Sequence, residues 1–190
     1  MKDRLRTFIA VSLSASVLAG IEKLICSLQA HSEGVHWVEP KNLHITLKFL
    51  GDVPLNDLPQ LIRAVTQSVR QTESFDLTFQ GIGAFPNRES PRTIWVGCRE
   101  GSKELGQLAE RINEGLIPLG FPKEARKFSP HLTIGRVKKA DIRSPLMSLP
   151  EEQQNRLLGS CSVSEVQIFS SELTRRGPIY DELAAIPLRF

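Results

Sequence analysis

The sequence predicts an α+β fold built from two similar halves, each with the element order β-α-β-α-β, within a single domain that spans residues 1–190. The order His, apolar, Thr, apolar occurs twice, at His44–Leu47 and at His131–Ile134. The segments that surround these two motifs also have matching hydrophobic periodicity. We therefore expect an internal repeat that covers approximately residues 4–80 and 92–170.

The first half contains five main predicted elements in alternating order, and a further short strand is predicted over 35–38. Apolar and β-forming residues predict strands over 7–11, around His44 and over 75–79, and helices over 14–29 and 58–69. Ser12 and Ser14 are both suitable N-caps for the first helix. The glycine, proline and asparagine residues of 81–91 predict a loop that separates this half from the next.

The second half repeats this order with nearly the same spacing. The predicted elements are strands over 93–97, around His131 and over 163–169, helices over 103–117 and 151–158, and an irregular connection over 138–150. Thr7 precedes His44 by 37 residues, and Thr93 precedes His131 by 38. Two such halves, related by an approximate two-fold axis, would bring the two motifs together across a cleft.

Composition favours a soluble globular protein, with 41% hydrophobic and 24% charged residues in a chain of 190. The net charge of +3 permits an anionic ligand without requiring one. Cys26, Cys98 and Cys161 are odd in number and widely spaced, which matches neither a disulfide framework nor a zinc site. We expect a cytoplasmic protein that has no signal peptide, no membrane-spanning segment and no bound metal.

The two motifs differ in the basic residue that follows each of them. Residues 42–51 alternate as a half-buried strand does, so His44, Thr46 and Lys48 are predicted to share one open face. Lys48 could then attract a phosphate, although a solvated lysine is equally compatible with the pattern. Arg136 alternates onto the face opposite His131 unless a bulge intervenes, and this favours a structural role.

Two histidines on opposite sides of one pocket can act as acid and base in the same turnover, because the ordinary histidine pKa of about 6.5 lies near neutrality. Hydrolysis of a cyclic phosphodiester needs such a pair, and Thr46 and Thr133 could donate hydrogen bonds to the phosphate oxygens. One His-x-Thr on a strand is usually structural. Its recurrence at matching places has no structural explanation, and His31 and His36 lack the pattern.

These residues resemble a known family. The segments Trp37–Gly51 and Phe128–Arg136 are similar to the two motifs of the RNA 2′,3′-cyclic phosphodiesterases, the bacterial and archaeal 2′-5′ RNA ligase-like branch of the two-histidine phosphoesterases. Arg6–Ala10 and Gly177–Tyr180 resemble the family's opening strand and its C-terminal Gly-Pro-x-Tyr. The resemblance covers nearly the whole chain, and the paired motif is its specific part.

The resemblance implies a bilobal fold, in which two antiparallel sheets face a central cleft and the helices lie outside. It also implies metal-free, cofactor-free hydrolysis of an RNA 2′,3′-cyclic phosphate to a 2′-phosphomonoester, with reversible 2′-5′ ligation in some members. His44 would be the proton donor and His131 the acceptor, with Thr46 and Thr133 at the phosphate. Lys48, Arg136 and Tyr180 are further candidates for substrate contact.

The expected partner is an RNA or tRNA-like end that carries a 2′,3′-cyclic phosphate, bound by a monomer without a membrane or an obligate protein partner. Two alternatives stay open. One is a cyclic phosphodiesterase for small nucleotides, such as an ADP-ribose cyclic phosphate. The other is a non-catalytic module that binds RNA ends, which would not need two titratable side chains.

Overall fold

The computed structural model describes residues 3–30, 32, 34–138, 146, 150–175 and 177–190. His31 and most of the connection predicted over 138–150 lie outside these residues. The strands are β1 (Arg4–Val11), β2 (Val35–Trp37), β3 (Ile45–Pro54), β4 (Phe75–Phe85), β5 (Thr93–Cys98), β6 (His131–Val137), β7 (Leu157–Val163), β8 (Glu165–Thr174) and β9 (Gly177–Pro187). The helices are α1 (Ala15–Gln29), α2 (Leu58–Val69), α3 (Ser102–Leu116) and the short α4 (Glu151–Gln154), with 3₁₀ turns η1 (Pro40–Asn42), η2 (Leu55–Asp57) and η3 (Ile117–Leu119).

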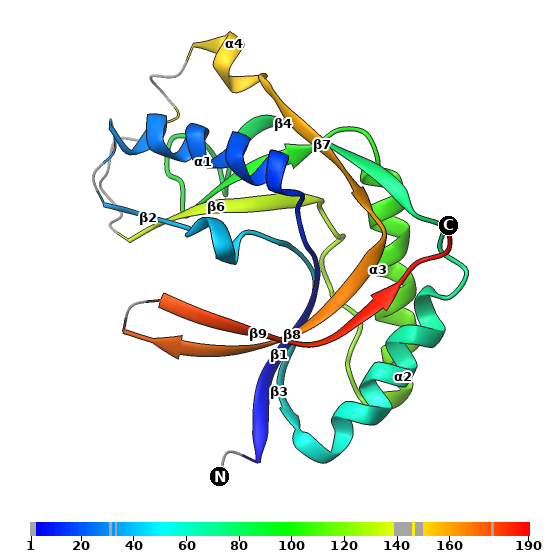
Figure 1. Cartoon of the computed structure of the whole chain (residues 1–190). Helices are drawn as coiled ribbons and strands as arrows, with labels where there is room; N and C mark the ends of the chain where they lie inside the picture. Colours follow the sequence, from blue (N-terminus) through cyan, green and yellow to red (C-terminus); the bar gives the residue numbers. More distant parts are fainter. Residues whose placement is uncertain (1–2, 31, 33, 139–145, 147–149, 176) are drawn as a thin grey trace.

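The strands form two antiparallel sheets, which confirms the predicted α+β class (Figure 1). One sheet has the order β3-β1-β8-β9, and the other has the order β2-β6-β5-β4-β7. β4, the third predicted strand of the first half, therefore pairs in the sheet that holds β5 and β6 of the second half. β8, which contains most of the third predicted strand of the second half, pairs in the sheet that holds β1 and β3 of the first half. This exchange ties the two halves together, and the matching order β3-β1-β8 and β6-β5-β4 is what a duplication would produce. The internal repeat itself stays a prediction.

The helices pack on the outer sides of the two sheets (Figure 1). α1 contacts β7 and β2 of the five-stranded sheet, whereas α2 and α3 contact each other and, respectively, β9 and β3 of the four-stranded sheet. Each of the three presents one apolar stripe to the core, as in α1, where Val17, Ile21, Ile25 and Leu28 are buried. Ser14 caps α1 by accepting a hydrogen bond from the Val17 amide at 3.4 Å, which selects one of the two predicted caps.

Several predicted boundaries are wrong, and strand pairing explains each case. β4 continues through Phe85 where a loop was expected, because its end pairs with β5 beyond a register shift near Gly81. Residues from Leu157 leave the predicted helix and form β7 against β4. The strand predicted over 163–169 combines the end of β7 with the start of β8, and β9 carried no strand signal. The glycine- and serine-rich β7 has low β-propensity, so its ladder with β4 decides its conformation.

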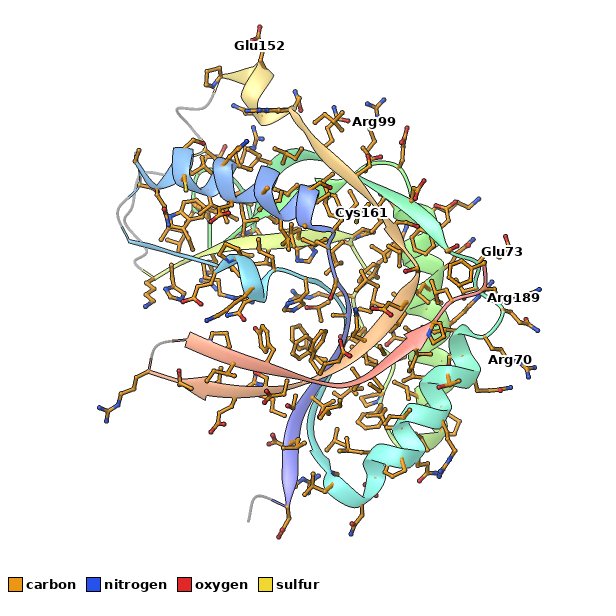
Figure 2. All side chains as sticks on the ribbon, viewed as in Figure 1. Arg70, Glu73, Arg99, Glu152, Cys161 and Arg189 are labelled. Atoms are coloured by element: carbon orange, nitrogen blue, oxygen red, sulfur yellow. The ribbon has the colours of Figure 1, made fainter. Side chains whose placement is uncertain are left out.

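The end of the chain contacts the turn between α2 and β4. The Arg189 amide donates to the Thr72 carbonyl at 2.9 Å, and the Ser74 amide donates to the Arg189 carbonyl at 2.7 Å. Figure 2 shows Glu73 and Arg189 beside each other at this point. Through these bonds the residues that follow β9 tie the end of the chain to the turn after α2. In the described part of the chain, no helix has the length and apolar character needed to cross a bilayer.

Gly101 allows α3 to begin close to the backbone of β4. Its φ is 74°, and a Cβ at this position would lie 2.1 Å from the Asp76 carbonyl oxygen. Gly120, at the other end of the same helical region, has φ of 84° with nothing within 4 Å of an added Cβ. The two glycines thus share a left-handed conformation, and only Gly101 is also crowded.

We expect Gly101→Ala to destabilise the fold by about 3 kcal/mol or more, because a left-handed residue costs roughly 1–2 kcal/mol and overpacking adds a similar amount. Gly120→Ala should cost only the first part, about 1 kcal/mol. Urea denaturation of both variants measures the difference. Equal losses would show that the approach of α3 to β4 is not the constraint.

Candidate active site

His44 lies immediately before β3 and is held by an aromatic cluster from the four-stranded sheet. Its ring stacks on Phe8 of β1 with centroids 4.8 Å apart, and the Tyr180 ring of β9 meets it edge-on at 5.2 Å. Phe169 of β8 in turn stacks on Phe8 at 5.4 Å. The Asn42 side-chain amide donates to the Pro178 carbonyl at 3.1 Å, so the Gly-Pro-x-Tyr segment is tied to the first motif.

His131 is the first residue of β6 and has its own aromatic neighbours. Phe85 meets its ring edge-on at 5.1 Å, and the Trp95 ring lies 6.5 Å away. Trp95 lies directly over the backbone of β4, where a Cβ on Gly83 would be 2.2 Å from the indole ring. Phe85 belongs to the part of β4 that was predicted to be loop, so the sequence pattern did not place it at the site.

Both histidines make the same hydrogen bond to the backbone. His44 Nδ1 lies 2.8 Å from the Asn42 carbonyl oxygen, and His131 Nδ1 lies 2.6 Å from the Ser129 carbonyl oxygen. A carbonyl only accepts, so Nδ1 carries the proton in each ring and Nε2 of the neutral imidazole is left to accept one. Each motif therefore presents Nε2 as its reactive atom, a feature that the order His-x-Thr does not contain.

Thr46 and Thr133 lie on the histidine side of their strands. Thr46 pairs with Ala10, which shares a face of β1 with Phe8, and Thr133 pairs with Trp95. After each threonine the ladder shifts by one residue: Ile9 pairs with Lys48, and Ile94 pairs with Gly135. These two bulges reverse the alternation of side chains beyond the threonines.

The first bulge turns Lys48 away from His44, so the prediction that they share a face is wrong. The Lys48 side chain is 3% exposed. Its ammonium donates to Asn113 Oδ1 of α3 at 2.6 Å and to the Pro122 carbonyl at 2.8 Å. Lys48 is therefore committed to the layer between β3 and α3 and does not belong to the candidate site.

The second bulge turns Arg136 onto the same side of β6 as His131, so the predicted opposite face is also wrong. Its exposed guanidinium lies close enough to the other sheet to contribute to lowering the pKa of His44. Burial raises the pKa of Tyr180, and the positive charges of Arg136 and Arg6 oppose that rise. The structure thus gathers His44, Tyr180 and Arg136 from three distant segments, and it adds Arg6, which sequence analysis missed.

The two strands that carry the motifs lie close together. β3 and β6, which carry the motifs, contact each other although they belong to different sheets. A groove of about 670 Å³ between α2 and α3 is lined by neither histidine. Within the residues that the structure describes, no three His, Cys, Asp or Glu side chains form a group that could hold a metal ion. The chemistry of the site is that of imidazole, hydroxyl, phenol and guanidinium groups.

Two antiparallel sheets, each contributing a His-x-Thr motif with a backbone-bound Nδ1, define the fold of a two-histidine phosphoesterase. The family model described as the 2′-5′ RNA ligase superfamily matches residues 15–175, and the chain belongs to this superfamily.

Known proteins resemble the chain over almost its entire length. An RNA 2′,3′-cyclic phosphodiesterase of Methanothermobacter thermautotrophicus is 37% identical over 97% of this chain and 100% of its own. The crystal structure of TT0787 of Thermus thermophilus aligns with a TM-score of 0.82 at 30% identity, covering 97% and 98% of the two chains. E. coli LigT complexed with 3′-AMP aligns with a TM-score of 0.77 at 26% identity, covering 97% and 98%.

The environment of His44 disfavours its charged form. Burial lowers its pKa from the ordinary 6.5 to about 4, aided by the charge of Arg136 and opposed by the bond to the Asn42 carbonyl. His44 of the free protein is therefore neutral at pH 7. Because the unfolded chain binds this proton more readily, His44 contributes stability that is complete above pH 6.5 and is lost as the pH falls through about 4.

We expect the Cε1 proton of His44 to titrate in NMR with a pKa of about 4. The associated loss of folding free energy between pH 6.5 and 4 should be at most roughly 3 kcal/mol, and His44→Gln should remove this part of the pH dependence. Arg136→Met should raise the His44 pKa, since it removes a nearby positive charge. A His44 pKa near 6.5 in the wild-type protein would contradict the burial that the structure shows.

Proposed function

We propose that this protein hydrolyses the 2′,3′-cyclic phosphate at an RNA end to a 2′-phosphomonoester, without a metal ion, by paired action of His44 and His131. The observation that carries the proposal is the matched Nδ1 bond, which leaves Nε2 of both rings free to exchange a proton with a substrate. The curated relatives named RNA 2′,3′-cyclic phosphodiesterase support the reaction class.

The reaction requires one proton to be removed and one to be delivered. A water oxygen forms a bond to phosphorus while one Nε2 takes its proton, and the bond from phosphorus to the 3′ oxygen breaks while the other Nε2 protonates that oxygen. Thr46, Thr133 and Arg136 would donate hydrogen bonds to the non-bridging oxygens as charge accumulates there. A 5′-hydroxyl in place of water would form a 2′-5′ linkage, the reaction after which the superfamily is named.

The family resemblance makes His44 the donor and His131 the acceptor. A donor must be protonated before the chemical step, yet the pKa of His44 is lowered to about 4 in the free protein. A bound phosphate anion next to the ring favours its charged form and would raise this pKa. The assignment of His44 as donor therefore depends on the substrate to charge it.

We expect His44→Ala and His131→Ala each to lower kcat for hydrolysis by about 10²–10⁴-fold, since each removes a general acid or base. Thr46→Ala and Thr133→Ala should cost less, about 10–100-fold, the equivalent of one hydrogen bond to a charged group. The double histidine variant should be little worse than either single one because the pair acts as a unit. Full activity in either single variant would exclude the two-histidine mechanism.

A substrate whose leaving group needs no proton separates donor from acceptor. On such a substrate the donor variant should recover much of its activity, and the acceptor variant should not. Recovery by His44→Ala supports the assignment from the family, and recovery by His131→Ala instead reverses it. In either case the wild-type rate should be bell-shaped in pH, with limbs that belong to the coupled pair.

A product assay in EDTA distinguishes the three candidate functions. RNA with a 2′,3′-cyclic phosphate end and cyclic mononucleotides are incubated separately with the protein, and we expect the RNA to be converted to a 2′-phosphate end with chelator present. Turnover of the small nucleotides alone would favour the small-nucleotide enzyme. Binding of RNA without turnover would favour the binding module, and loss of activity in EDTA with recovery on adding a divalent ion would refute the metal-free mechanism.

A further inference from the structure

Lys48 is a buried cation that the proposed chemistry does not use. Its ammonium donates to Asn113 Oδ1 at 2.6 Å and to the Pro122 carbonyl at 2.8 Å, and Asn113 in turn donates to the Ala109 carbonyl at 2.9 Å. Lys48 and Asn113 are 3% and 4% exposed. Burial lowers the pKa of Lys48, and the carboxylate of Glu124 opposes that effect. A buried charge held mainly by neutral acceptors is costly, so its position calls for a physical explanation.

The Pro122 carbonyl belongs to the segment that leads into the second motif. Residues 121–130 contain neither helix nor strand and join η3 to β6. This segment supplies the Ser129 carbonyl that accepts from His131 Nδ1. Lys48 extends from β3 of the other sheet, so one side chain connects the strand of the first motif with the backbone that approaches the second.

The ion pairs of this segment lie at the surface. Lys123 pairs with Glu110 and Glu114, but all three side chains are about half exposed, and such pairs contribute little. A cavity of about 270 Å³, lined by Lys48, Phe49 and residues 121–125 among others, separates part of the segment from β3. Phe121 and Phe128 pack against the core near the two ends of the segment, and the Phe121 amide donates to the Leu116 carbonyl at 3.3 Å. Between these two aromatic side chains, the bond from the Lys48 ammonium to the Pro122 carbonyl ties the backbone of the segment to β3.

We propose that Lys48 is a positioning residue for the second motif: by fixing the 121–130 segment it sets the Ser129 carbonyl and, through it, the orientation and tautomer of His131. Of the two motifs, only the first has room for a long side chain at the position that follows its bulge. The equivalent position after the second bulge is Gly135, where a Cβ would already lie 3.0 Å from Trp37 and Val35. The kinetic part of this inference rests on the proposed function.

The test is Lys48→Met, which keeps the length and burial of the side chain and removes its donors. We expect kcat for a 2′,3′-cyclic phosphate to fall by about 10–100-fold, as for a catalytic group displaced by about 1 Å, with KM changed by less than about 3-fold. In ¹H–¹⁵N NMR, His131 should change from the Nδ1–H tautomer to a mixture of tautomers, while His44 should keep Nδ1–H because its partner Asn42 is not contacted by Lys48.

Two further variants keep the result interpretable. Lys48→Met with Asn113→Leu removes both members of the buried polar pair, and it replaces the single variant if that one does not fold. Lys123→Met is the matched control in the same segment, and its kcat and His131 tautomer should remain close to wild type.

Wild-type kcat in the Lys48 variants, equal disturbance of both histidines, or an equal effect of Lys123→Met would overturn the inference. If the wild-type protein hydrolyses no cyclic phosphate, the proposed function fails. The His131 tautomer would still decide the role of Lys48.

Discussion

The hydrogen bond from each histidine Nδ1 to the carbonyl two residues earlier is the interaction on which the site depends. It selects one tautomer at both motifs and leaves both Nε2 atoms available for proton transfer. The bond requires a fixed backbone just before each strand, at the end of η1 for Asn42 and in an irregular segment for Ser129. Asn42 is secured through its own side chain to β9. We infer that Ser129 is secured indirectly, from Lys48.

The two sheets present equivalent motifs in unequal surroundings. The ring of His44 is enclosed by Phe8 and Tyr180, and this burial lowers its pKa to about 4. His131 is flanked by Phe85, whose side chain is 37% exposed, and by Trp95. In the free protein, the lowered pKa of His44 opposes the donor role that the family resemblance gives this residue.

The equivalent bulges in β3 and β6 decide which basic side chain lies on the histidine side of its strand. Each inserts one residue after the threonine and reverses the alternation beyond it. The lysine of the first motif consequently serves the interior, and the arginine of the second faces His44 and Tyr180 across the sheets. The same kind of bulge thus places a lysine in the interior in one half and a positive charge near His44 and Tyr180 in the other.

The sequence by itself determined the class of fold, the positions of most helices and strands, and the two matching His-x-Thr motifs. These features depend on local periodicity and on a repeated motif, and both can be read from the order of residues along the chain. The tertiary structure decided the faces of Lys48 and Arg136, the extension of β4 to Phe85, and the strands β7 and β9. Bulges and ladder pairing arise from contacts between distant segments, here β3 with β1 and β6 with β5, and a side-chain alternation counted along a single strand carries no information about them.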